Sequence, residues 1–397
     1  MNFILFDDYS WKNLLPFTFT RPVSEIRIGI LTIHEKWEIF LDGKASWYTQ
    51  NYLSQKYPLI FYGTPNLWIN GKVIPNKNLC DKITSLNKGQ ALVGNNTLIA
   101  FNSGKELKFP EKIDLERLAS RFEIIECNST FALIENPWDI FTLNDKAIRE
   151  DFQILTENKK SQPISGTNKF AGIENIFIEK GAKVECSVLN ASDGPIYIGK
   201  NAEIMEGCLI RGPFALGEGA VLKMGTKVYG ATTIGPGCKV GGEVNNSVFF
   251  ANSNKAHDGF IGNSVIGEWC NLGADTNNSN LKNNYSNVKI WSHATEEMVD
   301  TGLQFCGLFM GDHSKCGINT MFNTGTVVGV SSNIYGGDFP IKFIPSFTWG
   351  GPEEFMDYRL EKSIEVAERV MLRRNLKMGK INKNIFNHIF QLTKNKK

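Results

Sequence analysis

The sequence has little that would link it to metal, nucleic acid or membrane. Its eight cysteines include no CxxC pair and no zinc-ligand spacing. The net charge is only +2, without a stripe of lysine and arginine, which argues against a nucleic-acid partner. No apolar run is long enough to span a bilayer. Fourteen prolines beside 37 glycines favour many tight turns over a disordered chain.

Signals for export are also lacking. The first apolar residues run directly into Asp7 and Asp8, without the basic and apolar regions of a secretory leader. In a chain of 397 residues, cysteines without disulfide spacing are expected to be reduced thiols. The length exceeds one ordinary core, so two or three domains are expected. These features predict a cytoplasmic protein without membrane or nucleic-acid partners.

A period of six residues runs through the C-terminal half. An aliphatic residue recurs at every sixth position without a miss, at Ile198, Ile204, Ile210, Leu216, Leu222, Val228, Ile234 and Val240. Glycine directly follows four of these residues, and a small residue usually follows four positions later. The register resumes at Ile266, Leu272, Met310, Cys316, Phe322 and Val328.

Period six fits neither an α-helix nor an alternating strand. It is typical of a solenoid with three flat faces per coil, in which the aliphatic residues point inward and glycine eases the turns. The sequence therefore predicts a parallel β-helix over residues 170–350. At a ladder spacing of about 4.8 Å, it would have about five coils. The polar breaks at residues 244–260 and 275–309 are interpreted as loops that leave one face and build the site.

The flanking regions have other patterns. Residues 1–160 alternate strands and helices, which indicates an α/β domain. Strands are predicted at residues 3–6, 59–62, 67–69, 91–98 and 122–125, and helices at residues 33–40 and 115–120. A polar linker is expected at residues 159–168. Residues 352–397 are predicted as C-terminal helices and a polar tail, because Met356, Leu360, Ile364, Ala367 and Met371 share one helical face.

The most specific motif covers residues 254–274, with the sequence NKAHDGFIGNSVIGEWCNLGA. A histidine follows a lysine-containing segment, and hexads with glycine after each aliphatic residue come next. This order resembles the acetyltransferase half of the GlmU family, bifunctional enzymes that make UDP-N-acetylglucosamine. The resemblance implies a left-handed β-helix, a homotrimer, and acetyl transfer from acetyl-CoA to glucosamine 1-phosphate.

In that family the histidine is the general base, so the resemblance assigns this role to His257. The chemistry is suitable, because an amine that attacks a thioester must lose a proton and histidine titrates near neutral pH. Backbone amides of a coil can donate hydrogen bonds to the developing oxyanion. A surface histidine without a catalytic role is the alternative.

Substrate-binding roles follow in part from the same resemblance. The family holds the sugar phosphate with basic residues on the β-helix, and uses an Asn-Tyr pair and a later lysine in an irregular loop. Arg211 is a further candidate from this sequence alone, because it interrupts a glycine position. The substrate-binding candidates are Lys223, Lys255, Arg211, Asn284, Tyr285 and Lys289. For each lysine, a solvated surface position is the alternative.

The N-terminal residues resemble the sugar nucleotidyltransferase fold of the same family in outline, through Leu14-Leu15-Pro16 and Thr20-Arg21-Pro22. The family's glycine-rich phosphate loop is missing, and its metal-binding Gly-Asp appears as Gly71-Lys72. If this domain is active, Arg21 and Arg27 are the nucleotide-binding candidates. Asn144, Asp7 and Asp8 are then the Mg²⁺ ligands for uridylyl transfer from UTP. A degenerate domain kept for binding or assembly is equally open.

Three alternatives to this interpretation differ in class. The first is an acyltransferase on another amino sugar or sugar nucleotide, since substrate choice lies in loops. The second is a β-helix metalloenzyme of the γ-carbonic-anhydrase type, which the sequence disfavours. It needs clustered histidines, and the five here are far apart, at His34, His257, His293, His313 and His388. The third is a non-catalytic sugar-nucleotide scaffold or sensor.

Overall fold

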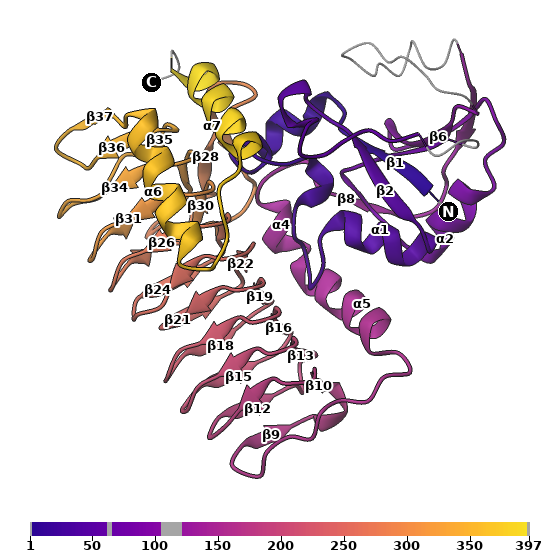
Figure 1. The fold of residues 1–397 in the computed structure, drawn as a ribbon. Helices are drawn as coiled ribbons and strands as arrows, with labels where there is room; N and C mark the ends of the chain where they lie inside the picture. Colours follow the sequence, from indigo (N-terminus) through magenta and orange to yellow (C-terminus); the bar gives the residue numbers. More distant parts are fainter. Residues whose placement is uncertain (1, 62–65, 105–120, 395–397) are drawn as a thin grey trace. The chain divides into compact units, whose positions relative to one another are not determined.

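The computed structural model describes residues 2–61, 66–104 and 121–394 (Figure 1). The chain forms two compact units. The N-terminal unit comprises Met1–Leu14, Thr20–Ile26 and Leu31–Asn136, and the C-terminal unit comprises Leu15–Phe19, Arg27–Ile30 and Pro137–Lys397. The predicted helix at residues 115–120 and the last three residues of the predicted tail lie outside the described residues. None of the described helices combines the length and the apolar character that crossing a bilayer requires.

The N-terminal unit is built on a six-stranded sheet in the order β2-β1-β3-β6-β5-β7. Strand β1 pairs in parallel with β2 and β3, β6 runs antiparallel to β3 and β5, and β7 is parallel to β5. The strands are β1 Asn2–Phe6, β2 Lys44–Tyr48, β3 Leu67–Asn70, β5 Gln90–Gly94, β6 Thr97–Asn102 and β7 Glu123–Glu126, with a separate pair β4 Val73–Ile74 and β8 Ala132–Leu133. The helices are α1 Ile33–Leu41 and α2 Lys77–Thr84, and the 3₁₀ turns of the N-terminal segments are η1 Tyr9–Leu14, η2 Phe17–Phe19, η3 Val23–Glu25 and η4 Asn51–Leu53.

Local sequence signals explain several of these elements. Helix α1 begins where Thr32 and Glu35 form a capping box, which satisfies the first free N–H groups. The strands predicted at residues 3–6, 67–69 and 122–125 and the helix at residues 33–40 are confirmed. The strand predicted at residues 91–98 is a hairpin, because Asn95 and Asn96 both adopt positive φ and turn the chain. Residues 59–61 form no strand, and the Ser46 hydroxyl holds the carbonyl of Ile60 instead of a ladder bond.

The C-terminal unit is a parallel β-helix with three faces (Figure 1). Face A contains nine strands: β10 Ile176–Ile178, β13 Ile196–Ile198, β16 Phe214–Leu216, β19 Thr232–Ile234, β22 Val248–Phe249, β25 Val265–Ile266, β30 Leu308–Met310, β33 Thr326–Val328 and β35 Phe343–Ile344. Face B contains β11 Lys183–Val184, β14 Glu203–Ile204, β17 Val221–Leu222, β20 Lys239–Val240, β23 Asn254–Lys255, β26 Asn271–Leu272, β31 Lys315–Cys316, β34 Asn333–Ile334 and β36 Thr348–Gly350, with β37 Phe355–Asp357 antiparallel at its end.

Face C begins with a six-stranded sheet and continues as a pair of strands. Its strands are β9 Lys169–Ala171, β12 Val188–Asn190, β15 Leu209–Arg211, β18 Lys227–Tyr229, β21 Glu243–Asn245, β24 Phe260–Gly262, β27 Asn277–Asn278 and β32 Met321–Phe322. All the aliphatic residues of the predicted series from Ile198 to Val240 lie in one buried core. The predicted fold class is therefore confirmed.

Glycine after an inward residue is required by the stacking of coils. At Gly235, an added Cβ would lie only 1.6 Å from the carbonyl oxygen of Phe250 on the next coil. The β-helix is longer than the predicted five coils, because face A alone has nine strands. The hexad register resumes in the later coils, as at Ile266 and Met310, but the count was too low because segments of varying length interrupt the register while the strands stay paired.

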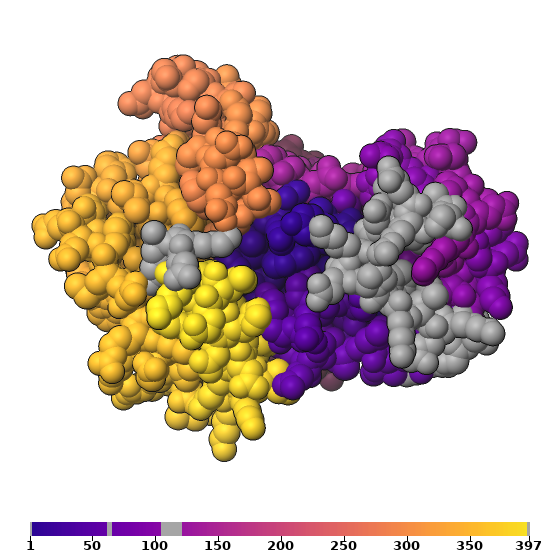
Figure 2. All heavy atoms as spheres, turned by 90° about the horizontal axis from the view of Figure 1, so that it is seen from above, coloured from indigo at the N-terminus to yellow at the C-terminus, as the bar shows by residue number. Residues whose placement is uncertain are grey.

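The two predicted breaks differ in the structure. Residues 244–260 stay within the ladder, where Val244, Phe249 and Lys255 pair with residues of the preceding coil. The second break is partly regular as well, because β27 pairs with β32 and the inward Asn278 side chain bonds the backbone of Gly262. Only residues 279–307 leave the ladder. They carry the antiparallel hairpin of β28 (Lys289–Ser292) and β29 (Glu297–Asp300), in the orange lobe that projects in Figure 2.

Helices precede and follow the ladder along the chain. Helices α4 (Asp139–Thr142) and α5 (Asn144–Thr156) precede it, and α6 (Leu360–Leu372) and α7 (Lys380–Thr393) follow it. Leu360, Ala367 and Met371 are buried on α6 as predicted, but Met356 lies in β37 and is exposed. Beyond α6, Arg374 donates a hydrogen bond to the carbonyl of Gly237, which fixes this segment on the ladder.

Candidate functional site

His257 lies on the corner that joins β23 on face B to β24 on face C. Its side chain is exposed, and the described residues form no hydrogen bond with its imidazole. The ring is therefore available to accept a proton from a bound ligand.

Lys223 begins the same kind of corner two coils earlier, and the structure brings it near the His257 corner. Gly241 lies between them, and a Cβ added there would lie 3.2 Å from Lys223 Cβ and 2.7 Å from the carbonyl oxygen of Ala256. Only a glycine thus separates Lys223 from the coil that carries His257.

Lys255 points into the coil rather than toward a ligand. Its side chain is fully buried, and Nζ donates to the carbonyl oxygens of His257 (2.7 Å) and Asp258 (2.8 Å). Burial lowers the pKa of Lys255 to about 8, against the opposing effect of Asp258. An ammonium in this position cannot reach a sugar phosphate on the outer surface.

The remaining substrate-binding candidates lie elsewhere on the unit. Arg211 is the last residue of β15, so it lies at the opposite end of the face C strands from the His257 corner, and its contact with Asp193 is a long, exposed ion pair of 3.9 Å. Asn284, Tyr285 and Lys289 belong to the inserted segment, which also leaves face C at its far end. Tyr285 is 65% exposed with φ of 57°, and the Asn284 side chain closes a local turn onto the Ser286 N–H.

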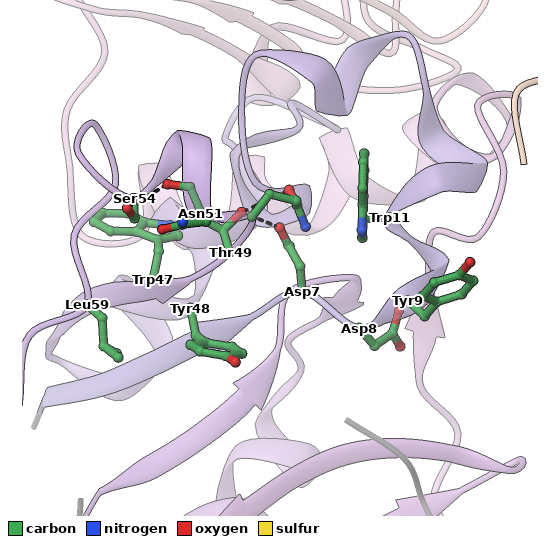
Figure 3. Close-up of a pocket in the computed structure, with 11 residues that line it drawn as sticks. Asp7, Asp8, Tyr9, Trp11, Trp47, Tyr48, Thr49, Asn51, Ser54 and Leu59 are labelled. Carbon is green, nitrogen blue, oxygen red and sulfur yellow. Dashed lines mark hydrogen bonds between the residues drawn. The ribbon is translucent and has the colours of Figure 1, made fainter. Parts of the chain in front are cut away.

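The N-terminal unit contains a cavity of about 500 Å³ at the carboxyl ends of β1 and β2 (Figure 3). Ligands of α/β sheets commonly bind at this edge. Its lining combines two carboxylates with aromatic and amide side chains: Asp7, Asp8, Tyr9, Trp11, Trp47, Tyr48, Thr49, Gln50, Asn51, Ser54 and Leu59. The cavity is suited to a ring with hydroxyl groups, because aromatic faces pack against rings and amides bond hydroxyls.

Asp7 is held by the protein itself. Its carboxylate accepts hydrogen bonds from the Val23 N–H (2.9 Å) and the Thr49 hydroxyl (2.6 Å). Burial raises the pKa of Asp7 to about 7, although these two hydrogen bonds oppose the shift. The protonated form of Asp7 is therefore favoured far more than in an ordinary, solvated aspartate.

Asp8 points away from Asp7 in Figure 3, and it forms an ion pair with Lys72. Its Oδ2 lies 3.2 Å from Lys72 Nζ and accepts a hydrogen bond from Asn70 (2.9 Å), while Oδ1 accepts one from the Ser10 N–H (2.9 Å). Burial alone would raise the pKa of Asp8, but the Lys72 ammonium and these hydrogen bonds outweigh it and hold the pKa below its ordinary value.

The predicted Mg²⁺ ligands do not fit a shared ion. Both oxygens of Asp8 are engaged, and Asp7 is turned to Thr49 and Val23. Asn144 is committed within the C-terminal unit, where Oδ1 accepts from the Gly29 N–H (2.7 Å) and Nδ2 donates to the Ala231 carbonyl (2.9 Å). Within the described ranges, no group of three histidine, cysteine, aspartate or glutamate residues is placed to hold a metal.

The two arginines predicted to bind a nucleotide do not line the cavity. Arg21 is almost fully buried in the N-terminal unit, and its guanidinium contacts the Thr20 hydroxyl at 3.4 Å. Arg27 belongs to the C-terminal unit, where Nη1 donates to the carbonyl of Ile30.

Sequence reasoning missed the partner of Asp8. Lys72 stands in the Gly71-Lys72 pair that the sequence analysis noted only for its missing carboxylate. A lysine in the short turn between two buried apolar segments is unusual, because lysine is seldom buried unless it is paired. That anomaly was the available signal. Trp11 and Trp47 carried no spacing pattern that could have placed them in one cavity.

Known proteins resemble this chain both in sequence and in structure. Residues 3–160 match the family model described as "Sugar nucleotidyl transferase". The chain has a sugar nucleotidyltransferase-like domain. A curated relative from Sulfurisphaera tokodaii, a bifunctional sugar-1-phosphate nucleotidylyltransferase/acetyltransferase, is 27% identical over 245 residues, 60% of this chain. The match spans only 53% of that relative's length.

Solved structures of acyltransferases are also similar, at low levels. A UDP-N-acetylglucosamine acyltransferase from Arabidopsis is 16% identical, with a TM-score of 0.24, and covers 58% of this chain and 90% of its own. Another from Bacteroides fragilis is 17% identical, with a TM-score of 0.28, and covers 57% of this chain and 84% of its own. The strand pairing described above, rather than these scores, establishes the β-helix.

Proposed function

We propose that the β-helix transfers an acetyl group from acetyl-CoA to the amino group of glucosamine 1-phosphate, with His257 as the general base. The observation that carries the proposal is the exposed His257 imidazole on a corner next to Lys223. The amine attacks the thioester carbonyl, the imidazole takes the amine proton, and the CoA thiolate leaves and is protonated. In this proposal Lys223 attracts the sugar phosphate.

The domain assignment belongs to the same proposal. The proposed domains are residues 1–160 for the nucleotidyltransferase-like part, of which residues 137–160 belong to the C-terminal compact unit, residues 170–350 for the acyltransferase and residues 352–397 for the C-terminal helices and tail. Arg211, Asn284, Tyr285 and Lys289 are the further residues proposed to bind substrate, and the protein is proposed to form a homotrimer with its sites between neighbouring prisms. A monomeric mass in light scattering would contradict the trimer.

The experiment is acetyl-CoA-dependent release of free thiol in the presence of glucosamine 1-phosphate. We expect His257→Ala to lower kcat by about 10²–10⁴-fold, the usual contribution of a general base. The control is His388→Ala, which removes an exposed histidine of α7 and leaves the rate unchanged. Activity with another amino sugar or sugar nucleotide only would keep the mechanism and change the substrate. Equal rates for His257→Ala and the wild type would refute the assignment of His257.

A second function is favoured for the N-terminal cavity, namely ligand binding without uridylyl transfer. The supporting observation is the Asp8–Lys72 pair, which leaves no carboxylate oxygen of Asp8 for Mg²⁺. With UTP, Mg²⁺ and the acetylated sugar phosphate, we expect no pyrophosphate. Pyrophosphate release would restore the bifunctional assignment, and absence of both activities would favour a sugar-nucleotide sensor.

A further inference from the structure

The corner that carries His257 departs from the other four-residue corners between faces B and C. In those corners the third residue has positive φ, as in Gly207, Gly225, Asp275 and Asn319. The fourth residue is small and buried, as in Cys208, Thr226, Thr276 and Thr320. In the corner of residues 256–259, the positive φ moves to the fourth residue, Gly259, at 114°. The His257 backbone therefore follows a different path.

The closing hydrogen bond of the ordinary corner is also replaced. The Thr276 and Thr320 hydroxyls donate to the first carbonyls of their own corners, at 2.7 Å and 3.0 Å. Gly259 has no side chain that could do this, and a Cβ there would lie 2.2 Å from the Thr276 carbonyl oxygen. Instead, Lys255 Nζ donates to two carbonyls of the corner.

One backbone bond between coils changes as well. Elsewhere the carbonyl of the second corner residue accepts the N–H of the next coil, as Ala274 does from Asn319 at 2.8 Å. The Asp275 N–H bonds the carbonyl of Asp258 (3.1 Å), which leaves the His257 carbonyl to Lys255. The corner before it on the stack holds only Gly241 and Gly242, two residues instead of four. Lys255 thus supplies a hydrogen bond to the His257 carbonyl that the backbone of the neighbouring coils does not supply.

The location of Lys255 carries a desolvation cost, because its ammonium group is removed from water. Lys255 occupies an inward position of face B, paired with Val240, where the other coils place apolar residues. A buried ammonium is tolerated only when its donors are satisfied. Its satisfied donors all serve residues 257 and 258.

We propose that Lys255 is a positioning residue, which sets the backbone conformation of residues 256–259 and so the place from which the His257 imidazole acts. The kinetic part of this inference rests on the proposed acetyl transfer, whereas the structural part does not. A base must lie within hydrogen-bond reach of the amine, and a displacement of about 1 Å costs about 10²-fold in rate.

The test compares Lys255→Met with the same change at a second, half-buried lysine of face B. Lys315→Met is the control, because Lys315 lies on the same face, has a pKa lowered to about 8 by burial and donates to one carbonyl, that of His313, at 2.7 Å. In Lys255→Met, we expect amide hydrogen exchange of residues 256–260 to rise about tenfold while the rest of the ladder keeps its protection. We expect kcat to fall about 10²-fold with KM for acetyl-CoA within about twofold.

A third variant separates positioning from loss of the core. Lys255→Gln keeps two N–H donors on a shorter side chain, so it should recover part of both effects. Unchanged exchange at residues 256–260 in Lys255→Met would overturn the proposal, and so would equal losses in Lys315→Met. If Lys255→Met does not fold, Lys255→Gln takes its place in both measurements. If the wild-type protein transfers no acetyl group, the proposed function fails, but hydrogen exchange still decides the part played by Lys255.

Discussion

The carboxylates of the N-terminal cavity and the imidazole of His257 differ in how far the protein itself satisfies their hydrogen bonds. In the cavity, Asp7 and Asp8 are bonded by the protein itself, and Lys72 provides the charge that Asp8 requires. On the corner, the exposed imidazole of His257 is left to solvent while a buried lysine holds the backbone beneath it. This difference agrees with the two proposals, acetyl transfer at the corner and ligand binding in the cavity.

The largest expected effect comes from removing Lys72, the cation paired with Asp8. We expect Lys72→Met to destabilise the N-terminal unit by about 3 kcal/mol, because it removes the cation paired with the largely buried Asp8 carboxylate and leaves it only the hydrogen bonds from Asn70 and Ser10. His257→Ala should change the free energy of unfolding by less than about 0.5 kcal/mol. Denaturant titration of both variants measures the contrast. Adding Asp8→Asn to Lys72→Met should recover part of the loss, and a milder Lys72→Met would show that the pair is not needed.

The next test concerns Asn144, a predicted metal ligand that the structure uses for packing. Asn144→Ala removes the bonds to Gly29 and Ala231 and leaves their backbone groups buried. We expect a loss of about 2–3 kcal/mol in the C-terminal unit. Asp145→Ala, which removes an exposed ion pair with Arg149 and the carboxylate in the first turn of α5, should cost less than about 1 kcal/mol. A loss in Asn144→Ala that appears only when Mg²⁺ is present would instead support a metal site.

A smaller effect is expected from the pH dependence of Asp7. Its folded pKa of about 7 lies above the unfolded value of 3.8, so the folded protein binds more protons between these values. Stability is therefore lost as the pH rises from about 4 to about 7, and the loss stays constant above that range. Asp7→Asn removes the titration and should be more stable than the wild type by about 1–2 kcal/mol at pH 8, after allowance for solvent screening. Thermal melts at pH 5 and pH 8 check this, and a gap that narrows toward pH 8 would contradict the sign.

The smallest expected effect is that of magnesium. Because a ligand raises the melting temperature only if it binds the folded state, millimolar Mg²⁺ or EDTA should shift the melting temperature by less than about 1 °C. Differential scanning calorimetry measures this. A rise that Lys72→Met enhances would show that the lysine competes with a cation for Asp8.

The hexad period predicts the β-helix well because each coil repeats one physical requirement. The series from Ile198 to Val240 is buried because every sixth residue points into the same core. Departures from the repeat were harder to interpret. Asn278 and Lys255 are polar at inward positions, and their roles depend on carbonyl groups of Gly262 and His257 that a sequence pattern does not position.

The candidate site was predictable only where it lies close in sequence. His257 follows from a local motif, but the nearness of Lys223 depends on a glycine of the intervening coil. The N-terminal cavity collects residues that follow two different strands, so its lining emerges only from the pairing of β1 with β2. The partner of Asp8, Lys72, lies 64 positions along the chain and follows a third strand.

The stacking of coils has a mechanical consequence. Each coil of the ladder pairs only with the coil before and the coil after it, so its stability is a sum over neighbours. If the β-helix were pulled from its C-terminal end, coils would detach in turn, each about 18 residues and about 60 Å of extended chain except the longer coil that carries residues 279–307. Force would rise and fall once per coil. The corner of residues 256–259 would remain folded until the pull reached its own coil.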